Sequence, residues 1–211
     1  MTSDISQIQR LPERGTTDRQ MINEILDEGL VCHVAYVVDD RPVVIPTLYV
    51  RDEDRLLLHG SHASGIARAV KRGSNLSAAV THIDGLVVAR TGFHSSANYR
   101  SVVAHGKGRL LEGTEHAAAT DVIVDGLIPG RAADVRPATT QELRSTAVIE
   151  LTLDEVSAKV RTGPPVDEPE DLNTGVWAGV VPISVEFKEP TPAADLEPGI
   201  APPEYLTEYR R

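Results

Sequence analysis

The pattern of hydrophobic positions changes near residue 30 of the chain. From residue 30 to residue 58, three runs rich in Val, Leu, Ile and Tyr are separated by two charged segments, residues 39–42 and 51–55. Apolar runs of this length that are bounded by turn-forming residues predict strands. Because the connections are short, the three strands are expected to form an antiparallel β-meander.

Helical spacing of apolar residues marks four other segments. Residues 17–29 carry an apolar stripe, a capping box at Thr17 and Gln20, and Gly29 as a stop signal. Further helices are expected over residues 65–72, 114–127 and 139–144, the last with a capping box at Thr139 and Glu142. With so few helices, we expect them to cover a β-structure.

The remaining apolar runs predict further strands over residues 76–80, 86–90, 101–111, 147–153, 157–161 and 176–187. After Lys188, five prolines favour an extended tail. Many short strands with few helices predict a mainly β fold, a closed or nearly closed barrel with short helices around it. We expect an N-terminal leader at residues 1–16, one barrel domain at 17–188 and a Pro-rich tail at 189–211.

Composition narrows the class of protein. The chain has 211 residues, of which 41% are hydrophobic and 25% charged, which is typical of a folded domain. A net charge of -10 repels nucleic-acid phosphates, and no cluster of Lys and Arg offsets it, so no nucleic-acid partner is expected. The single cysteine, Cys32, lies in an apolar run, and no run is long enough to span a membrane. These features predict a cytoplasmic protein.

The first candidate binding loop covers residues 59–64, with the sequence His-Gly-Ser-His-Ala-Ser. It leads into a predicted helix that carries Arg68, so hydroxyl groups, backbone N–H groups and a cation lie close together, as a phosphate monoester requires. A solvated helix with hydroxyl caps explains the same residues, so both interpretations stay open. The glycine-rich nucleotide motifs and the GxSxG motif are absent from the sequence.

The second candidate loop covers residues 91–101, directly before an apolar run. It offers amide, phenol, guanidinium and hydroxyl groups from Asn98, Tyr99, Arg100 and Ser101. A loop that bonds its own backbone is the alternative interpretation. Trp177 is the only tryptophan, and the sequence leaves two roles for it, a ring that stacks near a ligand or a half-buried core side chain.

Part of the chain resembles a known family. The segment from Thr81 to Thr91, followed by the Asn-Tyr-Arg-Ser-Val-Val run at 98–103, is similar to the signature of the pyridoxamine 5'-phosphate oxidase-like flavoproteins, and most similar to their nitroimidazole reductase branch. Residues 157–165 and 176–182 also resemble members of this group. The similarity spans residues 17–188.

The resemblance implies an FMN-binding split β-barrel that works as a homodimer, with FMN held between the barrel and the partner subunit. It implies an FMN-dependent oxidoreductase with a small-molecule substrate. His59 matches a histidine with a mechanistic role in the nitroimidazole reductase branch, so it is the candidate catalytic residue. The residues expected to bind the cofactor are Pro46, Thr47, His59, Ser61, Ser64, Arg68, Asn98, Tyr99, Arg100, Ser101 and Trp177.

One departure from the family pattern bears on the cofactor. Many relatives have a basic residue where this chain has Gly65, and only Arg68 of that pattern remains. Losing one charge-assisted bond to a phosphate weakens binding by about ten- to a hundredfold. Two alternatives therefore stay open: a flavin carrier or sensor without turnover, and a split barrel that binds deazaflavin or haem, the haem through His59, His62, His82 or His94.

Overall fold

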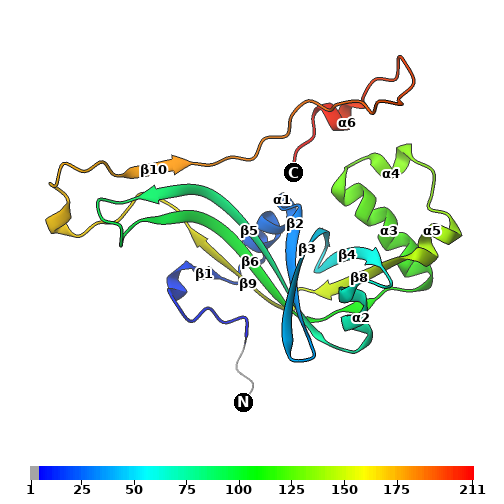
Figure 1. Cartoon of the computed structure of the whole chain (residues 1–211), viewed down its shortest axis with the longest axis horizontal. Helices are drawn as coiled ribbons and strands as arrows, with labels where there is room; N and C mark the ends of the chain where they lie inside the picture. The colour runs from blue at the N-terminus through cyan, green and yellow to red at the C-terminus, as the bar shows by residue number, and fades with distance from the viewer. Residues whose placement is uncertain (1–4) are drawn as a thin grey trace.

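The computed structural model describes residues 5–211, which form an antiparallel sheet with helices around it (Figure 1). The strand order within these residues is β1-β9-β6-β5-β2-β3-β4-β8-β7, and β10 pairs with β5. The strands are β1 (Gly15–Thr16), β2 (Val31–Val38), β3 (Arg41–Asp52), β4 (Arg55–Ser61), β5 (Asn75–Val88), β6 (Ser96–Lys107), β7 (Arg109–Leu110), β8 (Thr146–Thr152), β9 (Glu155–Arg161) and β10 (Gly179–Pro182).

Most of the helices contact strands of the sheet. The helices are α1 (Arg19–Glu28), α2 (Gly65–Lys71), α3 (Gly113–Leu127), α4 (Arg131–Asp134), α5 (Thr140–Ser145) and α6 (Glu204–Thr207), and short 3-10 helices cover Pro12–Arg14 and Pro169–Asp171. The capping box predicted at Thr139 and Glu142 is present at the start of α5. The box predicted at Thr17 and Gln20 is wrong, because Asp18 is the N-cap of α1 and accepts from the Met21 N–H.

The sheet curves so that β6 and β8 come into contact, which encloses the main core. This core combines inward-facing strand residues such as Val34 and Leu58 with Ile25 of α1 and Ala67 of α2, all at most 1% exposed. A second cluster lies under α3, where Ile123 packs on the other face of β3, β4 and β8. The predicted mainly β fold with short peripheral helices is confirmed.

Three predicted boundaries are wrong. The strands expected at 76–80 and 86–90 are one strand, β5, with an irregularity between Ile83 and Gly85 that absorbs an extra residue. The sequence Asp84-Gly85 is typical of a turn, which explains the error. β6 begins at Ser96 rather than at 101, so Asn98, Tyr99 and Arg100 belong to a strand. The strand expected over 176–187 is limited to the four residues of β10.

Strand β3 belongs to two halves of the sheet. Its first part, Arg41 to Leu48, pairs with β2, and its last part, Tyr49 to Asp52, pairs with β4. β3 and β4 therefore separate after the pair Tyr49–Leu58. Between residues 41 and 48, the edge of β3 that would face β4 has no strand partner in the described structure. We call this place the fork.

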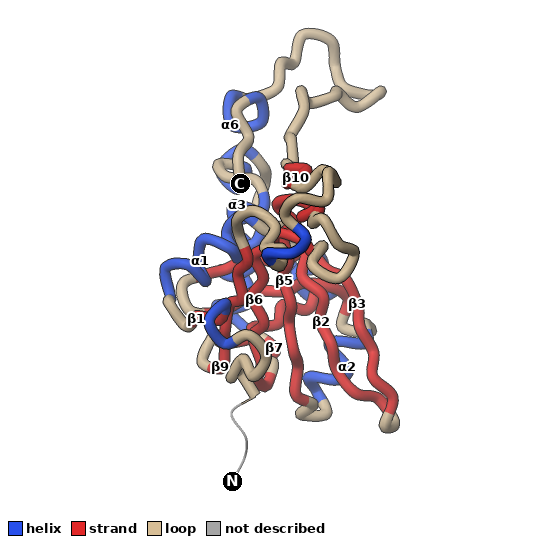
Figure 2. The backbone as a smooth tube through the Cα atoms, turned by 90° about the vertical axis from the view of Figure 1, so that its left-hand side faces the viewer, coloured by secondary structure: helices blue, strands red, loops and turns tan. Residues whose placement is uncertain are grey.

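Residues 183–211 form an extended segment that returns from β10 toward the body of the molecule (Figures 1 and 2). We call this segment the arm. Its end is attached at several points: the Tyr205 hydroxyl donates to Asp134 (2.6 Å), and the Tyr209 hydroxyl donates to the carbonyl of Leu127 (2.8 Å). The Phe187 and Tyr209 rings meet edge to face, 4.7 Å apart. The predicted tail is thus extended, and its last residues dock on α3 and α4.

Candidate functional site

The fork gathers five of the predicted site residues. Pro46 and Thr47 lie on the unpaired edge of β3, while His59 and Ser61 lie on β4 beyond its last pair with β3. Ser64 follows and caps α2, accepting from the Ala67 N–H at 3.2 Å. Unpaired backbone N–H and C=O groups at a strand edge can bond a ligand with alternating donors and acceptors. The predicted cofactor-binding residues of β3 and those of the loop from His59 to Ser64 therefore lie around the fork.

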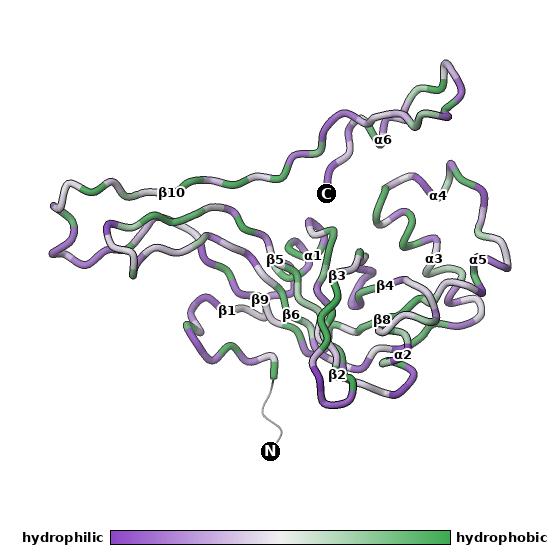
Figure 3. The backbone as a smooth tube through the Cα atoms, in the orientation of Figure 1, coloured by the Kyte–Doolittle hydropathy of each residue, from purple (hydrophilic) through white to green (hydrophobic). Residues whose placement is uncertain are grey.

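Gly65 is required by the packing beside the fork. A Cβ atom at this position would overlap the hydroxyl of Tyr36 on β2 and lie 3.9 Å from Ile45 of β3. The basic residue that relatives carry here is therefore excluded by the Tyr36 side chain. The contact also places the start of α2 directly beside the β2–β3 hairpin, whose tip is hydrophilic in Figure 3.

The polar groups of the first loop bond mainly to their own loop. The Ser61 hydroxyl accepts from the Ala63 N–H at 3.1 Å. The Arg68 guanidinium donates to the Ala63 carbonyl at 2.6 Å. In the described structure the rings of His59 and His62 have no hydrogen-bond partner, and both residues are exposed. The histidine rings are thus the polar groups of this loop that remain available.

The second set of predicted residues lies on β6 and is largely engaged within the fold. Asn98 is buried, donates to the Gly163 carbonyl (3.1 Å) and accepts from Arg161. The Ser101 hydroxyl donates to the Lys159 carbonyl on β9 (3.2 Å). Tyr99 is half-buried on the same strand. These groups hold β6 to β9 and the loop after it.

Arg100 is held by two carboxylates. It donates to Asp84 through Nε (3.0 Å) and Nη2 (2.8 Å), and to Glu28 through Nη2 (2.9 Å) and Nη1. Hydrogen bonds from Arg100 hold the pKa of both carboxyls below their ordinary values, and the pKa of Arg100 is raised by the same bonds. An anionic ligand would have to compete with these carboxylates for Arg100.

The two predicted sets of residues are not brought together within one chain. Strands β5, β2 and β3 lie between β6 and β4 in the sheet order. Trp177 lies before β10, is 64% exposed and is not part of the core, so the interpretation as a half-buried core ring is wrong. Ser64, Arg100 and Trp177 therefore lie on separate elements of the fold, at the start of α2, on β6 and before β10.

The structure also shows a cleft that the sequence did not indicate. It has a volume of about 700 Å³ and lies between the sheet and the arm. Its sheet side includes His33 of β2, Thr81 of β5 and the Glu28–Arg100–Asp84 cluster, and its arm side includes Val185 and Arg211. No short motif joins these residues, because they come from α1, β2, β5, β6 and the arm. One sequence feature does lie at the cleft: the turn-like pair Asp84-Gly85, at the irregularity in β5, where Asp84 accepts from Arg100.

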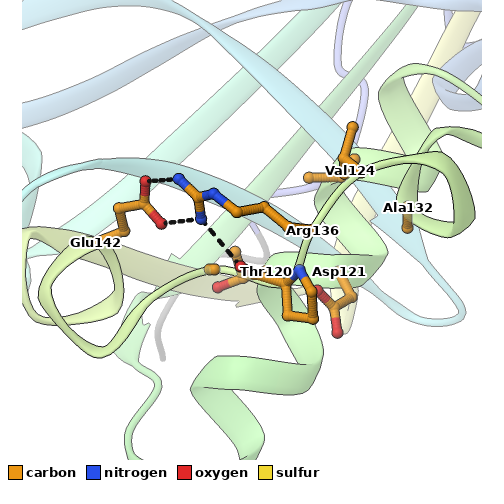
Figure 4. Close-up of a pocket in the computed structure, with 9 residues that line it drawn as sticks. Thr120, Asp121, Val124, Ala132, Arg136 and Glu142 are labelled. Atoms are coloured by element: carbon orange, nitrogen blue, oxygen red, sulfur yellow. Dashed lines mark hydrogen bonds and ion pairs between the residues drawn. The ribbon is translucent and has the colours of Figure 1, made fainter.

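A second cavity, of about 440 Å³, lies between α3, α4 and the segment before α5 (Figure 4). Its main charged groups are already paired: Arg136 donates to both carboxylate oxygens of Glu142, at 2.6 and 2.8 Å, and to the Pro137 carbonyl. This arrangement fixes the segment before α5, and it leaves no free cation for a ligand.

Two whole-chain observations concern metals and membranes. Among residues 5–211, no three His, Cys, Asp or Glu side chains gather as a metal site. The described helices are all too short or too polar to cross a membrane.

Comparisons with known proteins agree with the fold. The family profile described as pyridoxamine 5'-phosphate oxidase matches residues 18–160. The flavocytochrome Anf3 from Azotobacter vinelandii is 35% identical, over 99% of this chain and 97% of that chain, with a TM-score of 0.92. The FAD and haem binding protein from Mycobacterium smegmatis is also 35% identical, over 92% of this chain and 95% of that chain, with a TM-score of 0.89.

A more distant match concerns a candidate 5-nitroimidazole antibiotic resistance protein from Bacteroides thetaiotaomicron. It is 22% identical over 69% of this chain and 86% of that chain, with a TM-score of 0.59, which shows the fold alone. No curated protein sequence matches the chain. The profile covers more than half of the residues, and two structures share more than a third of the sequence over almost the whole length. The chain therefore belongs to the pyridoxamine 5'-phosphate oxidase family.

Proposed function

We propose that this protein is a flavin-binding redox protein that also binds haem. The observation that carries the proposal is the 35% identity, over almost the full length, to a flavocytochrome and to an FAD and haem binding protein. The fork supports the flavin part, because it joins an unpaired strand edge to a loop of polar side chains in the manner that the family resemblance implies.

The residues of the fork fit a flavin. The backbone of Pro46 and Thr47 would bond the polar edge of the ring system, and the loop from His59 to Ser64 would face its phosphates. A bound flavin would supply hydride and electron transfer, while the protein binds, orients and shields it. In this proposal His59 is the catalytic residue, since its ring is exposed and has no hydrogen-bond partner in the described structure.

FAD is the flavin that the observations favour over the FMN predicted from the family resemblance. The Mycobacterium smegmatis relative is named as an FAD and haem binding protein. In addition, Gly65 cannot be replaced by the basic residue of the FMN-binding pattern, and Arg68 already donates to the Ala63 carbonyl. A second phosphate and an adenosine would provide further contacts to offset the missing charge-assisted bond.

We propose a homodimer in which Asn98, Tyr99, Arg100, Ser101 and Trp177 of one copy face the fork of the other. The proposal is supported by exposed apolar residues on the outer face of β2 and β3, namely Val37, Val44 and Leu48, which are 42–59% exposed. A patch of this kind in a protein with an ordinary core is typical of an interface. The substrate would be a small molecule, and the protein would act in the cytoplasm.

The test is the absorbance spectrum of the purified full-length chain, followed by release of the ligand and its mass. We expect flavin bands and, after addition of hemin, a Soret band. His59→Ala should weaken flavin binding. A chain that binds neither FAD nor FMN would refute the proposal. Flavin that is reduced chemically but never reoxidised by nitroaromatic or quinone acceptors would favour a carrier over an enzyme.

A further inference from the structure

One guanidinium nitrogen in the wall of the cleft is buried without a hydrogen-bond partner. Arg211 donates through Nε to the Asp27 carbonyl (3.0 Å) and through Nη2 to the Tyr49 carbonyl (3.2 Å). Its guanidinium carbon lies 5.7 Å from the centre of the Tyr49 ring. The remaining nitrogen, Nη1, is buried and unsatisfied. An unmet charged donor costs free energy, so the Arg211 side chain would gain a hydrogen bond by turning toward an acceptor held in the cleft that it lines.

Among the described residues that line the cleft, Arg211 is an arginine that no carboxylate holds. Arg100 lines the same cleft, but Glu28 and Asp84 already accept from it. The two arginines therefore differ in function. Arg100 holds α1, β5 and β6 together, and Arg211 has one nitrogen, Nη1, without a hydrogen-bond partner.

His33 provides a second unused group. It lies on the outer face of β2 opposite Pro46 of β3, and it lines the cleft. In the described part of the chain, its ring has no hydrogen-bond partner. His82 differs, since its Nε2 already contacts the carbonyl of Ile25 at 2.9 Å. A neutral imidazole with a free nitrogen is an effective ligand for transition metals, including haem iron.

The walls of the cleft are apolar and accessible. Val31 and Ile83 on the sheet side are 43% and 44% exposed. On the arm side, Ile183, Val185 and Phe187 are 43%, 82% and 39% exposed. A volume of about 700 Å³ with apolar walls and a few polar groups is typical of a pocket for a large ring ligand.

We propose that this cleft binds haem, with His33 as the iron ligand and Arg211 as the partner of a haem carboxylate. The inference rests on the haem-binding part of the proposed function and adds the site and its residues. The arm would cover one face of the ring and the sheet the other. His33 and Arg211 are not among the residues proposed to hold the flavin, so each cofactor can be tested separately.

The test is a hemin titration of the full-length protein, followed by Soret absorbance. Arg211→Gln removes one charge-assisted bond and should weaken hemin binding by about ten- to a hundredfold. His33→Ala should change the position of the Soret band, because the iron loses its imidazole ligand. Val185→Glu alters an exposed arm residue, leaves the core intact and should also weaken binding by repelling the haem carboxylates. His62→Ala, outside the cleft, tests a histidine of the fork loop as the alternative iron ligand.

The outcomes separate this inference from the proposed function. Wild-type and His33→Ala proteins that bind hemin equally, with the same Soret band, would overturn the inference while haem binding itself stands. A spectral change in His62→Ala alone would assign the iron to the loop at the fork and would also overturn it. A wild-type protein that binds no hemin would refute both the haem function and this site. In each case, flavin binding is measured independently from its own bands.

Discussion

Replacing Arg100 with glutamine tests the reasoning about the Glu28–Arg100–Asp84 cluster. The substitution removes four hydrogen bonds from a guanidinium that is 28% exposed and leaves two carboxylates facing each other. Breaking a fully buried ion pair costs about 3–5 kcal/mol, whereas an exposed pair is worth about 0–1 kcal/mol. Because Glu28 and Asp84 are 43% and 33% exposed, solvent screening reduces the effect. We expect a loss of about 2 kcal/mol.

This loss should depend on pH in a defined direction. Arg100 lowers the pKa of Glu28 and Asp84 in the folded state below their ordinary values of 4.5 and 3.8. The stabilisation is therefore complete above these ordinary values, and it disappears as the pH falls through the lowered folded-state values. The difference in stability between wild-type and Arg100→Gln should be largest near neutral pH and shrink in acid.

The assay is thermal unfolding of both proteins from pH 7 to pH 3. A loss of about 2 kcal/mol corresponds to a decrease in Tm of about 4–8 °C for a chain of this size. Arg136→Gln is the control, because Arg136 is 65% exposed and its pair with Glu142 is solvated, so its effect on Tm should be smaller. An Arg100→Gln protein with the same decrease in Tm at every pH would refute the linkage between Arg100 and the two carboxylates.

Two further predictions concern packing and reactivity. Gly65→Ala should lower the free energy of unfolding, measured by denaturant titration, by about 1–3 kcal/mol, because the new methyl group overlaps the Tyr36 hydroxyl. Gly92→Ala is the control: its methyl group meets nothing within 4 Å, so the free energy of unfolding should be nearly unchanged. Burial raises the pKa of the Cys32 thiol to about 12. A thiol reagent at pH 8 should therefore modify Cys32 only after unfolding, and rapid labelling of the folded protein would contradict this prediction.

The local signals in the sequence predicted much of the fold. The meander at residues 30–58, the apolar stripe of α1 and the capping box of α5 appear where the sequence predicts them, although α1 begins after Asp18 and not at the predicted Thr17 box. Errors arose where tertiary pairing overrode a local signal. Asp84-Gly85 has turn chemistry, yet pairing with β6 and β10 on either side keeps β5 continuous through it.

The candidate site was predictable only in part. Pro46, Thr47, His59 and Ser61 meet at the fork because β3 and β4 are neighbours in sequence and in the sheet. Position 65 is glycine because the Tyr36 side chain, which comes from a distant strand, occupies the space beside it. No local sequence pattern predicts this contact. The cleft depends on the return of the arm to α1, where Arg211 contacts residues 162 and 184 positions earlier in the chain.

The divided pairing of β3 has a consequence for hydrogen exchange. Amides from Arg41 to Leu48 alternate between pairing with β2 and facing the fork without a strand partner, whereas Tyr49 to Asp52 pair with β4. One strand should thus contain slowly exchanging positions beside rapidly exchanging ones, separated by a single residue step. A ligand bound at the open edge of β3 would slow the exchange of only the rapidly exchanging amides. Hydrogen exchange in this strand would therefore show whether the fork is occupied.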